Sequence, residues 1–144
     1  MSSLYERLGG TYAIAGAVDI LVDRLFMNAK VNANPGVAEH HGQPANAPGY
    51  KFLVTAWSIK AAGGPDCYPG LDMVAAHDGL AITPEQFDAV AFEIEATLNF
   101  AGVPATERDE FMAIIESYRD EVVQAEASGE DESGTAMPPE PALA

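Results

Sequence analysis

Residues 63–103 read GGPDCYPGLDMVAAHDGLAITPEQFDAVAFEIEATLNFAGV, and this stretch decides the fold. It begins with a turn rich in glycine and proline, passes through a short apolar segment that ends at His77, and continues into a long segment of helical character. Met73 and His77 are four residues apart, so on a helix they share one face. We therefore expect His77 to stand on the face that carries whatever the chain binds.

The long segment has a recognisable start and a recognisable stop. Thr83, Pro84 and Gln86 have the pattern of a capping box with proline at the first helical position. Gly102 stands where a left-handed residue commonly ends a helix. The apolar residues between them recur at helical spacing, and they are Phe87, Val90, Ala91, Ile94, Leu98 and Ala101. The pattern predicts one long amphipathic helix between Thr83 and Gly102.

Similar spacing occurs on the N-terminal side of this stretch. Ser3 and Glu6 offer a capping box for a short first helix, which the pair Gly9 and Gly10 ends. A second helix is expected to begin at Thr11. Its apolar stripe consists of Ile14, Val18, Leu21, Val22, Leu25 and Phe26. This stripe is expected to face the core.

Two further helices complete the prediction. One covers residues 50–62, and the last begins with Thr106 as its cap and has the inward stripe Phe111, Ile114, Ile115, Tyr118 and Val122. Residues 27–49 have no clear period, so we treat them mainly as a connector, with a short helix at residues 37–41 as the alternative. Strand-like alternation is absent from the sequence. The predicted fold class is therefore all-α.

Composition limits the domain count and the class of partner. The 144 residues suit one domain, and 48% are hydrophobic, which indicates a globular protein. We predict a domain over residues 1–123 and an acidic, disordered tail over residues 124–144. The sequence shows no membrane span and no signal peptide, and its single cysteine excludes an internal disulfide, so we expect a cytoplasmic protein. A net charge of −15 argues against nucleic acid and anionic membranes as partners.

The central stretch also resembles a known family. The combination of Gly63-Gly64-Pro65, Tyr68, Gly70, Met73, His77, Leu80, Ile82-Thr83 and Phe87 resembles the proximal haem pocket of the truncated haemoglobins of group I. LYERLGG at residues 4–10 resembles the opening of that family, and the resemblance covers residues 3–123. The connection before the distal helix is longer than in the shortest members, which indicates a variant with an extended connection. The resemblance implies a two-over-two helical sandwich.

The resemblance also implies a cofactor and a set of site residues. The cofactor is haem b, and His77 is the ligand of its iron. Tyr68, Met73, Leu80, Ile82 and Phe87 line the haem on the same side, and Ile115 reaches it from the last helix. The opposite, distal side receives Val22 and Phe26 from the second helix and Tyr50, Lys51, Val54 and Trp57 from the third.

The distal side departs from the family pattern at Val22. Members usually have a tyrosine at this position that donates a hydrogen bond to bound ligand, and valine has no hydroxyl. Tyr50 is then the best distal donor, although it is equally expected to pack at the helix start with its hydroxyl in water. Lys51 is by default an ordinary surface lysine, and the alternatives are that it pairs with a haem propionate or ligates the iron. Weak polar stabilisation of bound dioxygen is expected.

Two histidines in the connector leave the coordination of resting iron open. The simplest interpretation places His40 and His41 in a solvated loop. The alternative is that one of them reaches the iron as a second axial ligand or acts as a proton relay. Tyr50 and Lys51 are the other candidates for such an internal sixth ligand.

Three functions compete at this point. We favour a haem protein that binds dioxygen or another small gas, such as CO or NO. The second is a haem enzyme, either a nitric oxide dioxygenase or a peroxidase-like catalyst, which would depend on an unidentified reductase. The third is a globin-fold interaction module without haem. Phosphate-binding loops, nucleophile elbows and paired cysteine or HExxH metal motifs are absent from the sequence.

Overall fold

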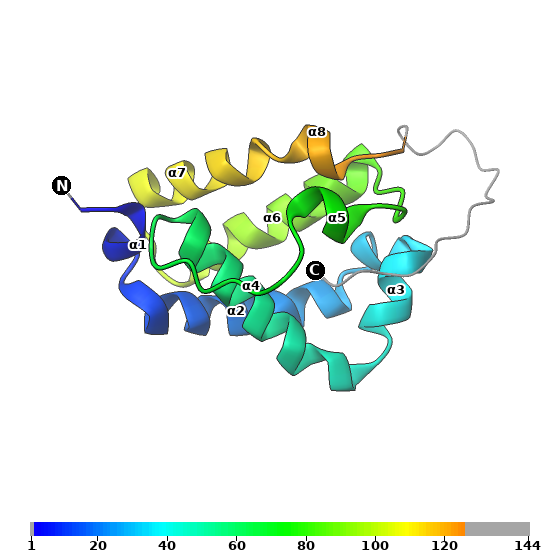
Figure 1. Ribbon diagram of the computed structural model, residues 1–144, viewed down its shortest axis with the longest axis horizontal. Helices are drawn as coiled ribbons and strands as arrows, with labels where there is room; N and C mark the ends of the chain where they lie inside the picture. The colour runs from blue at the N-terminus through cyan, green and yellow to red at the C-terminus, as the bar shows by residue number, and fades with distance from the viewer. Residues whose placement is uncertain (1, 126–144) are drawn as a thin grey trace.

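The computed structural model describes residues 2–125, and these residues form helices joined by short connections (Figure 1). The helices are α1 (Leu4–Arg7), α2 (Gly10–Met27), α3 (Pro35–His41), α4 (Ala47–Ala61), α5 (Met73–His77), α6 (Pro84–Phe100), α7 (Ala105–Glu116) and α8 (Arg119–Val122), with single 3-10 turns η1 (Val31–Ala33) and η2 (Pro44–Asn46). Within residues 2–125 the only β-type pairing is one isolated bridge between Ile82 and Val123. The predicted all-α class is confirmed.

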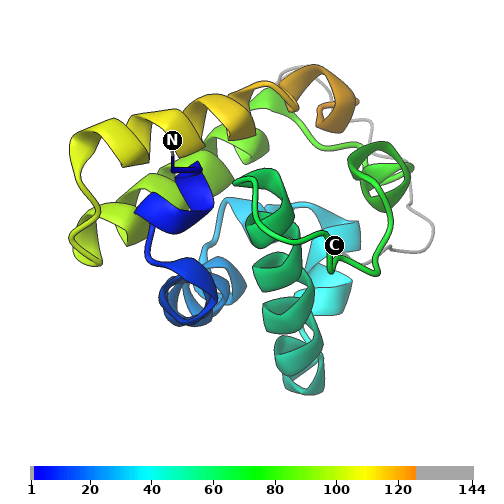
Figure 2. The same ribbon diagram turned by 60° about the vertical axis from the view of Figure 1, so that its left-hand side comes forward.

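The four long helices form two pairs that cross each other. Helix α2 packs chiefly against α4, and α6 packs against α7, while α2 also contacts α6 and so joins the pairs. In Figure 1, α7 and α6 lie above α2 and α4, and Figure 2 shows the same two layers with α2 seen nearly end-on. This is the predicted two-over-two sandwich. In the described part of the chain, no helix is long and apolar enough to cross a membrane.

Helix ends follow the local signals in most places. Ser3 and Glu6 form the predicted capping box of α1, and Thr83 and Gln86 form that of α6. Gly102 has a φ of 79°, the left-handed conformation expected after a helix. The predicted cap at Thr106 is wrong, because α7 begins at Ala105 after Pro104, and no side chain caps it.

Three apolar clusters form the interior of the part of the chain that the structure describes. The largest joins the two helix pairs and contains Leu4, Leu21, Ala62, Ile94, Leu98 and Phe111. A second lies between α2 and α4 and contains Ile14, Val18, Val22 and Ile59. The third lies beneath the loop between α5 and α6, where Leu80, Ile82 and Phe87 meet Val122 from α8. This third cluster fixes the position of the segment that carries His77.

The predicted connector is ordered, and one asparagine ties it to the rest of the fold. Asn34 is only 2% exposed and caps α3, because its side-chain oxygen accepts hydrogen bonds from the backbone N–H groups of Gly36 and Val37. Its amide nitrogen donates to the carbonyl of Leu80 at 2.7 Å. The alternative of a short helix at residues 37–41 is confirmed, and that helix begins earlier, at Pro35.

The last described residues are bound to the loop between α5 and α6. The backbone N–H groups of Gln124 and Ala125 both donate to the carbonyl of Ile82, at 2.9 and 3.0 Å. The side chain of Gln124 accepts a hydrogen bond from the backbone of Gly79. Residues 124 and 125 therefore contact the globular part, and the remainder of the predicted tail lies outside the described residues.

Candidate functional site

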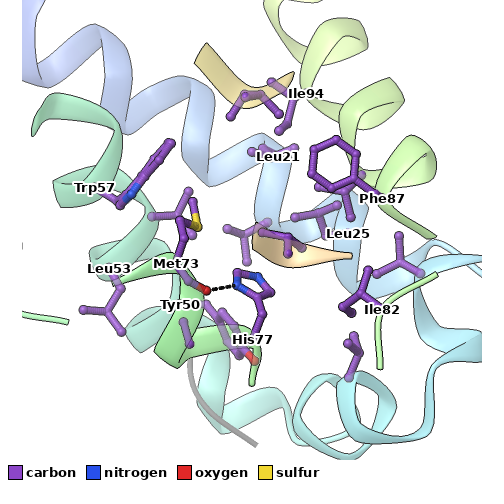
Figure 3. A pocket seen from close by; sticks show the side chains of 18 of the residues that line it. Leu21, Leu25, Tyr50, Leu53, Trp57, Met73, His77, Ile82, Phe87 and Ile94 are labelled. Atoms are coloured by element: carbon purple, nitrogen blue, oxygen red, sulfur yellow. Dashed lines mark hydrogen bonds between the residues drawn. The ribbon is translucent and has the colours of Figure 1, made fainter. Parts of the chain in front are cut away.

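A cavity of about 240 Å³ lies between α2 and α4 on one side and α5 and α6 on the other. Figure 3 shows 18 of the side chains that line it, and the lining is mainly apolar. Of the site residues predicted from the sequence, the structure brings these to the cavity: Val22, Phe26, Tyr50, Val54, Trp57, Tyr68, Met73, His77, Leu80, Ile82 and Phe87. The predicted contact of Ile115 with the same space is also present.

His77 is the last residue of α5, and a local hydrogen bond fixes its ring. Asp72 caps this five-residue helix by accepting a bond from the backbone N–H of Ala75. One turn then brings the carbonyl oxygen of Met73 within 2.9 Å of Nδ1 of His77 (Figure 3). Because a carbonyl only accepts hydrogen bonds, Nδ1 carries the proton and Nε2 keeps its lone pair.

The surroundings also keep this imidazole neutral. Burial lowers the pKa of His77 below the ordinary value, because a charged ring would lose its hydration in an apolar cavity. A neutral imidazole whose second nitrogen donates to a backbone carbonyl is the usual state of a histidine that binds a metal. The local geometry of α5 therefore presents a ready metal ligand to an apolar space.

Tyr68 lines the cavity from the loop that precedes α5. Its hydroxyl donates to the carbonyl of Leu71, so the ring is held by its own loop. A side chain at Gly70 would collide with that ring, since an added Cβ would lie 2.5 Å from the hydroxyl oxygen. Glycine at position 70 leaves room for this ring, and a larger residue there would push the Tyr68 ring aside.

The opposite wall is apolar around Val22, which is 1% exposed. Val54 and Trp57 of α4 line the same side. Tyr50 stands in the first turns of α4 with its ring edge-on to Phe26, at a centroid distance of 5.4 Å. Burial raises the pKa of Tyr50 to about 12, so its hydroxyl remains protonated and able to donate. The half-buried position of the ring also agrees with the alternative that Tyr50 packs at the start of α4.

His40 and His41 end α3, and both line the cavity. His41 stacks on Phe26 at a centroid distance of 4.4 Å and a 19° interplanar angle. Burial, together with the neighbouring His40, lowers the pKa of His41 to about 4. Nε2 of His40 is buried and has no hydrogen-bond partner among the described residues. The interpretation of these two rings as part of a solvated loop is wrong.

Lys51 is the predicted site residue that the structure does not bring to the cavity. Its ammonium group lies 2.7 Å from Asp19 and 2.9 Å from Asp23, both on α2. These ion pairs raise the pKa of Lys51 and join α4 to α2 on the outer side. The residue therefore behaves as the surface lysine of the default interpretation.

Several lining residues were missed by the sequence analysis. Val37 of α3, Gln86 of α6 and Tyr118, which follows α7, also face the cavity. The ring of Tyr118 packs edge-on against Trp57 at 5.7 Å. No local signal distinguishes Tyr118 from a core residue, because the contact joins two helices that are distant in the sequence.

The sequence is similar to known proteins over most of its length. A family model described as "Bacterial-like globin" matches residues 3–124. The chain is 35% identical over 108 residues to the group 1 truncated haemoglobin GlbN of Synechocystis sp., covering 72% of this chain and 82% of that protein. The chain belongs to the truncated haemoglobins of group I. A second relative is the group 1 truncated haemoglobin of Tetrahymena pyriformis. It is 26% identical to this chain, and the match covers 84% of this chain and 94% of the Tetrahymena protein.

Solved structures of truncated haemoglobins have the same fold. The crystal structure of the 2/2 haemoglobin of a Synechococcus species, in the cyanomet state and with covalently attached haem, has a TM-score of 0.74 at 29% identity, covering 85% of this chain and 98% of that one. The Fe(III) form of the Tetrahymena pyriformis protein has a TM-score of 0.72 at 25% identity, with the same coverage. Truncated haemoglobins are haem proteins that bind small gaseous ligands.

The cavity of this truncated haemoglobin can be compared with the needs of haem. Its apolar lining and the free Nε2 of His77 are the donor set that haem iron requires. The cavity volume of about 240 Å³ is below the roughly 300–1,000 Å³ that is usual for ligand pockets. The donor set and the apolar lining therefore fit the group.

Proposed function

We propose that this truncated haemoglobin binds a small diatomic gas at the iron of haem b, with Nε2 of His77 as the protein ligand. The observation that carries the proposal is the 2.9 Å hydrogen bond between Nδ1 of His77 and the carbonyl of Met73. It directs the lone pair of Nε2 away from its own helix and selects the tautomer that can bind a metal. The sequence has no CxxCH motif for covalent attachment, which supports haem b.

The residues around His77 hold this side chain in place and exclude water from it. Phe87, Leu80 and Ile82 pack into one cluster against Val122, which keeps water away from this side of the cavity. When bound, haem supplies an iron whose open side takes up dioxygen, CO or NO. The protein's contribution on the His77 side is a neutral imidazole in a fixed orientation and in a low-dielectric surrounding.

The opposite wall determines which gas is favoured. Val22, Val54 and Trp57 present mainly apolar surface to the cavity, so bound dioxygen, which gains from a hydrogen bond, is poorly stabilised there. CO and NO depend less on such a donor. We therefore propose that the protein favours these gases, with Tyr50 as the available hydroxyl donor at this wall.

The proposal includes a reducing environment. Iron that oxidises to the ferric state has to be reduced before it binds dioxygen or CO, so an unidentified reductase is part of the proposed system. A reducing, cytoplasmic location agrees with the single, exposed thiol at Cys67. The net charge of −15 again disfavours nucleic acid and anionic membranes as partners.

The enzyme and scaffold alternatives have less support. Dioxygenase turnover needs stabilised dioxygen, and Val22 stands where a tyrosine hydroxyl would provide it. A scaffold has no need for an oriented, neutral imidazole that faces a cavity. Mixing the dioxygen-bound protein with NO and measuring nitrate tests the first alternative, and stoichiometric haem binding excludes the second.

The decisive experiment replaces the proposed ligand and then supplies a substitute. Haem is titrated into the haem-free protein, and binding is followed by the Soret band. We expect one haem per chain for the wild type and a shift of the band with CO. His77→Gly should lose stable haem with little change in helical circular dichroism, and added imidazole should restore the spectrum. Val74→Ala is the matched control, since Val74 lies on the same helix and is 50% exposed. Unchanged haem binding by His77→Gly would overturn the proposal.

A further inference from the structure

The last described residues close one end of the cavity. Val122 is the final residue of α8, and it lines the cavity and is only 6% exposed. Its side chain packs with Leu80, Ile82 and Phe87. Helix α8 also packs against α5, the helix that ends at His77 (Figure 1). Lifting Val122 out of this cluster would therefore open the cavity to solvent beside His77.

Beyond Val122 the chain is attached to the α5–α6 loop by hydrogen bonds near the surface. The carbonyl of Ile82 accepts bonds from the backbone N–H groups of Gln124 and Ala125, at 2.9 and 3.0 Å. The side-chain oxygen of Gln124, an exposed residue, accepts a further bond from the N–H of Gly79 at 3.2 Å. We call residues 122–125 the clasp. A short segment held in this way opens at a lower free energy than a long packed helix.

The loop beneath the clasp is strained. Within residues 2–125, Ala81 is the only residue other than glycine with a positive φ, which is 56°. An alanine in this left-handed region is unfavourable because its Cβ approaches the backbone carbonyl. The amide of Asn34 holds the loop from the inner side by donating to the carbonyl of Leu80. Such strain persists only where the surroundings enforce it, so release of the clasp on the outer side lets the loop relax.

We propose that the clasp governs how fast the protein takes up and releases haem. This inference rests on the proposed function, because it needs haem bound at His77. While the clasp is docked, Val122 and the α5–α6 loop close the cavity at this end. When it lifts, with α6 and α7 still folded, the strained loop relaxes and this end opens. Gas binds on the side of the iron opposite His77, so the clasp acts on haem exchange and not on CO binding.

The test measures the transfer of haem from the loaded full-length protein to excess apomyoglobin, followed by the Soret band. Gln124→Pro removes one donor to Ile82 and the acceptor for Gly79, so it should speed transfer roughly tenfold. Its rate of CO binding should equal that of the wild type. Gln124→Ala removes only the bond to Gly79 and should speed transfer by about two- to threefold.

Ala105→Pro is the matched control for the proline. Ala105 is the first residue of α7, where a backbone N–H has no partner within the helix and proline is tolerated. The residue before it, Pro104, already has the extended conformation that a following proline favours. This variant should transfer haem at the wild-type rate.

A substitution in the loop should act in the opposite direction. Ala81→Gly removes the strain of the closed conformation, because glycine adopts a positive φ without steric cost. It should slow haem transfer by about threefold. Faster transfer from this variant would contradict the role given to the loop.

Hydrogen exchange of the haem-free protein tests the lifting itself. The amides of Gln124 and Ala125 should exchange roughly ten times faster than those of Ile94 and Leu98, which are buried on α6. Equal rates for the two groups would mean that the clasp opens only when the whole domain unfolds, and the inference would fail.

The results also separate this inference from the proposed function. If one haem binds through His77 but Gln124→Pro transfers it at the wild-type rate, the clasp does not govern exchange and the proposed function stands. Equal acceleration by Gln124→Pro and Ala105→Pro would likewise overturn the inference. If the wild type binds no stoichiometric haem, the proposed function itself fails and this inference fails with it.

Discussion

The two walls of the cavity hold their histidines in different ways. On the wall formed by α5 and α6, His77 is oriented by Met73, four residues earlier on the same short helix. On the wall formed by η1, α3 and α4, His41 is oriented by Asn32, nine residues away, and Asn34 reaches Leu80, 46 residues along the chain. The histidine of the first wall is thus oriented by a bond within one helical turn, and that of the second wall by a bond from a separate segment. The comparison predicts that the two walls respond differently to substitution.

The largest effect is expected in the apolar cluster beneath His77. Phe87→Ala removes a buried ring that packs with Leu80, Ile82 and Val122, and it should lower the free energy of unfolding by about 3–5 kcal/mol. Phe92→Ala is the control, because Phe92 lies on the same helix and is 65% exposed. Urea unfolding followed by circular dichroism measures both. Equal effects of the two substitutions would show that the cluster does not support this wall.

On the other wall, Asn34→Ala should cost roughly 2–3 kcal/mol, which combines the loss of a helix cap with an unpaired buried carbonyl at Leu80. Asn34→Ser should recover only the part of this free energy that comes from capping α3, because serine can cap a helix but cannot donate to the Leu80 carbonyl in the same way. The same urea titration checks both variants, and hydrogen exchange at Gly36 and Val37 reports on the cap itself. If Asn34→Ala is neutral, the connector is not fixed by this residue and the contrast between the walls weakens.

A smaller effect separates a true helix cap from an apparent one. Thr83→Ala removes the side-chain half of a capping box and should destabilise the protein by about 1 kcal/mol. Thr106→Ala should change stability by less than about 0.5 kcal/mol, because Thr106 lies inside α7 and caps nothing. Thermal unfolding of the two variants side by side distinguishes them. A larger loss of stability for Thr106→Ala than for Thr83→Ala would show that Thr106 caps the last helix, as the sequence indicated.

The smallest effect is expected at Lys51. Its pairs with Asp19 and Asp23 lie on the outer side, so Lys51→Met should bind haem with wild-type stoichiometry and spectrum. Any difference in stability from the wild type should disappear in 1 M salt, which screens exposed charges. Haem titration checks the stoichiometry and the spectrum, and urea unfolding at low and high salt checks the stability. A change in the haem spectrum of Lys51→Met would show that Lys51 contacts the haem site.

The sequence predicts the His77 wall well because its signals are local. The capping box of Thr83 and Gln86 and the spacing of Met73 and His77 can each be recognised within a few residues. The apolar stripe of α2 was expected to face inward, and Val22 and Phe26 of that stripe line the cavity. For these residues, helical periodicity and family resemblance are sufficient.

The connector could not be predicted in the same way. Asn32 and Asn34 are side chains whose partners lie elsewhere in the fold, and asparagine in a segment without a period ordinarily indicates a turn. The sequence therefore indicated a loop, and His40 and His41 were expected in solvent. Lys51 was assigned to the site from its place near Tyr50, and its acidic partners one turn apart on α2 became apparent only in three dimensions.

The bonds from Gln124 and Ala125 to Ile82 affect how the protein matures during synthesis. These residues leave the ribosome after every other part of the described fold, and Val122 completes the cluster under the α5–α6 loop at the same late stage. Until then, α2, α4 and α6 can pack on one another, but the segment that carries His77 is not closed. A nascent chain from which residues 122–125 have not yet emerged is therefore not ready to hold a cofactor at His77, and the site closes only when these residues dock.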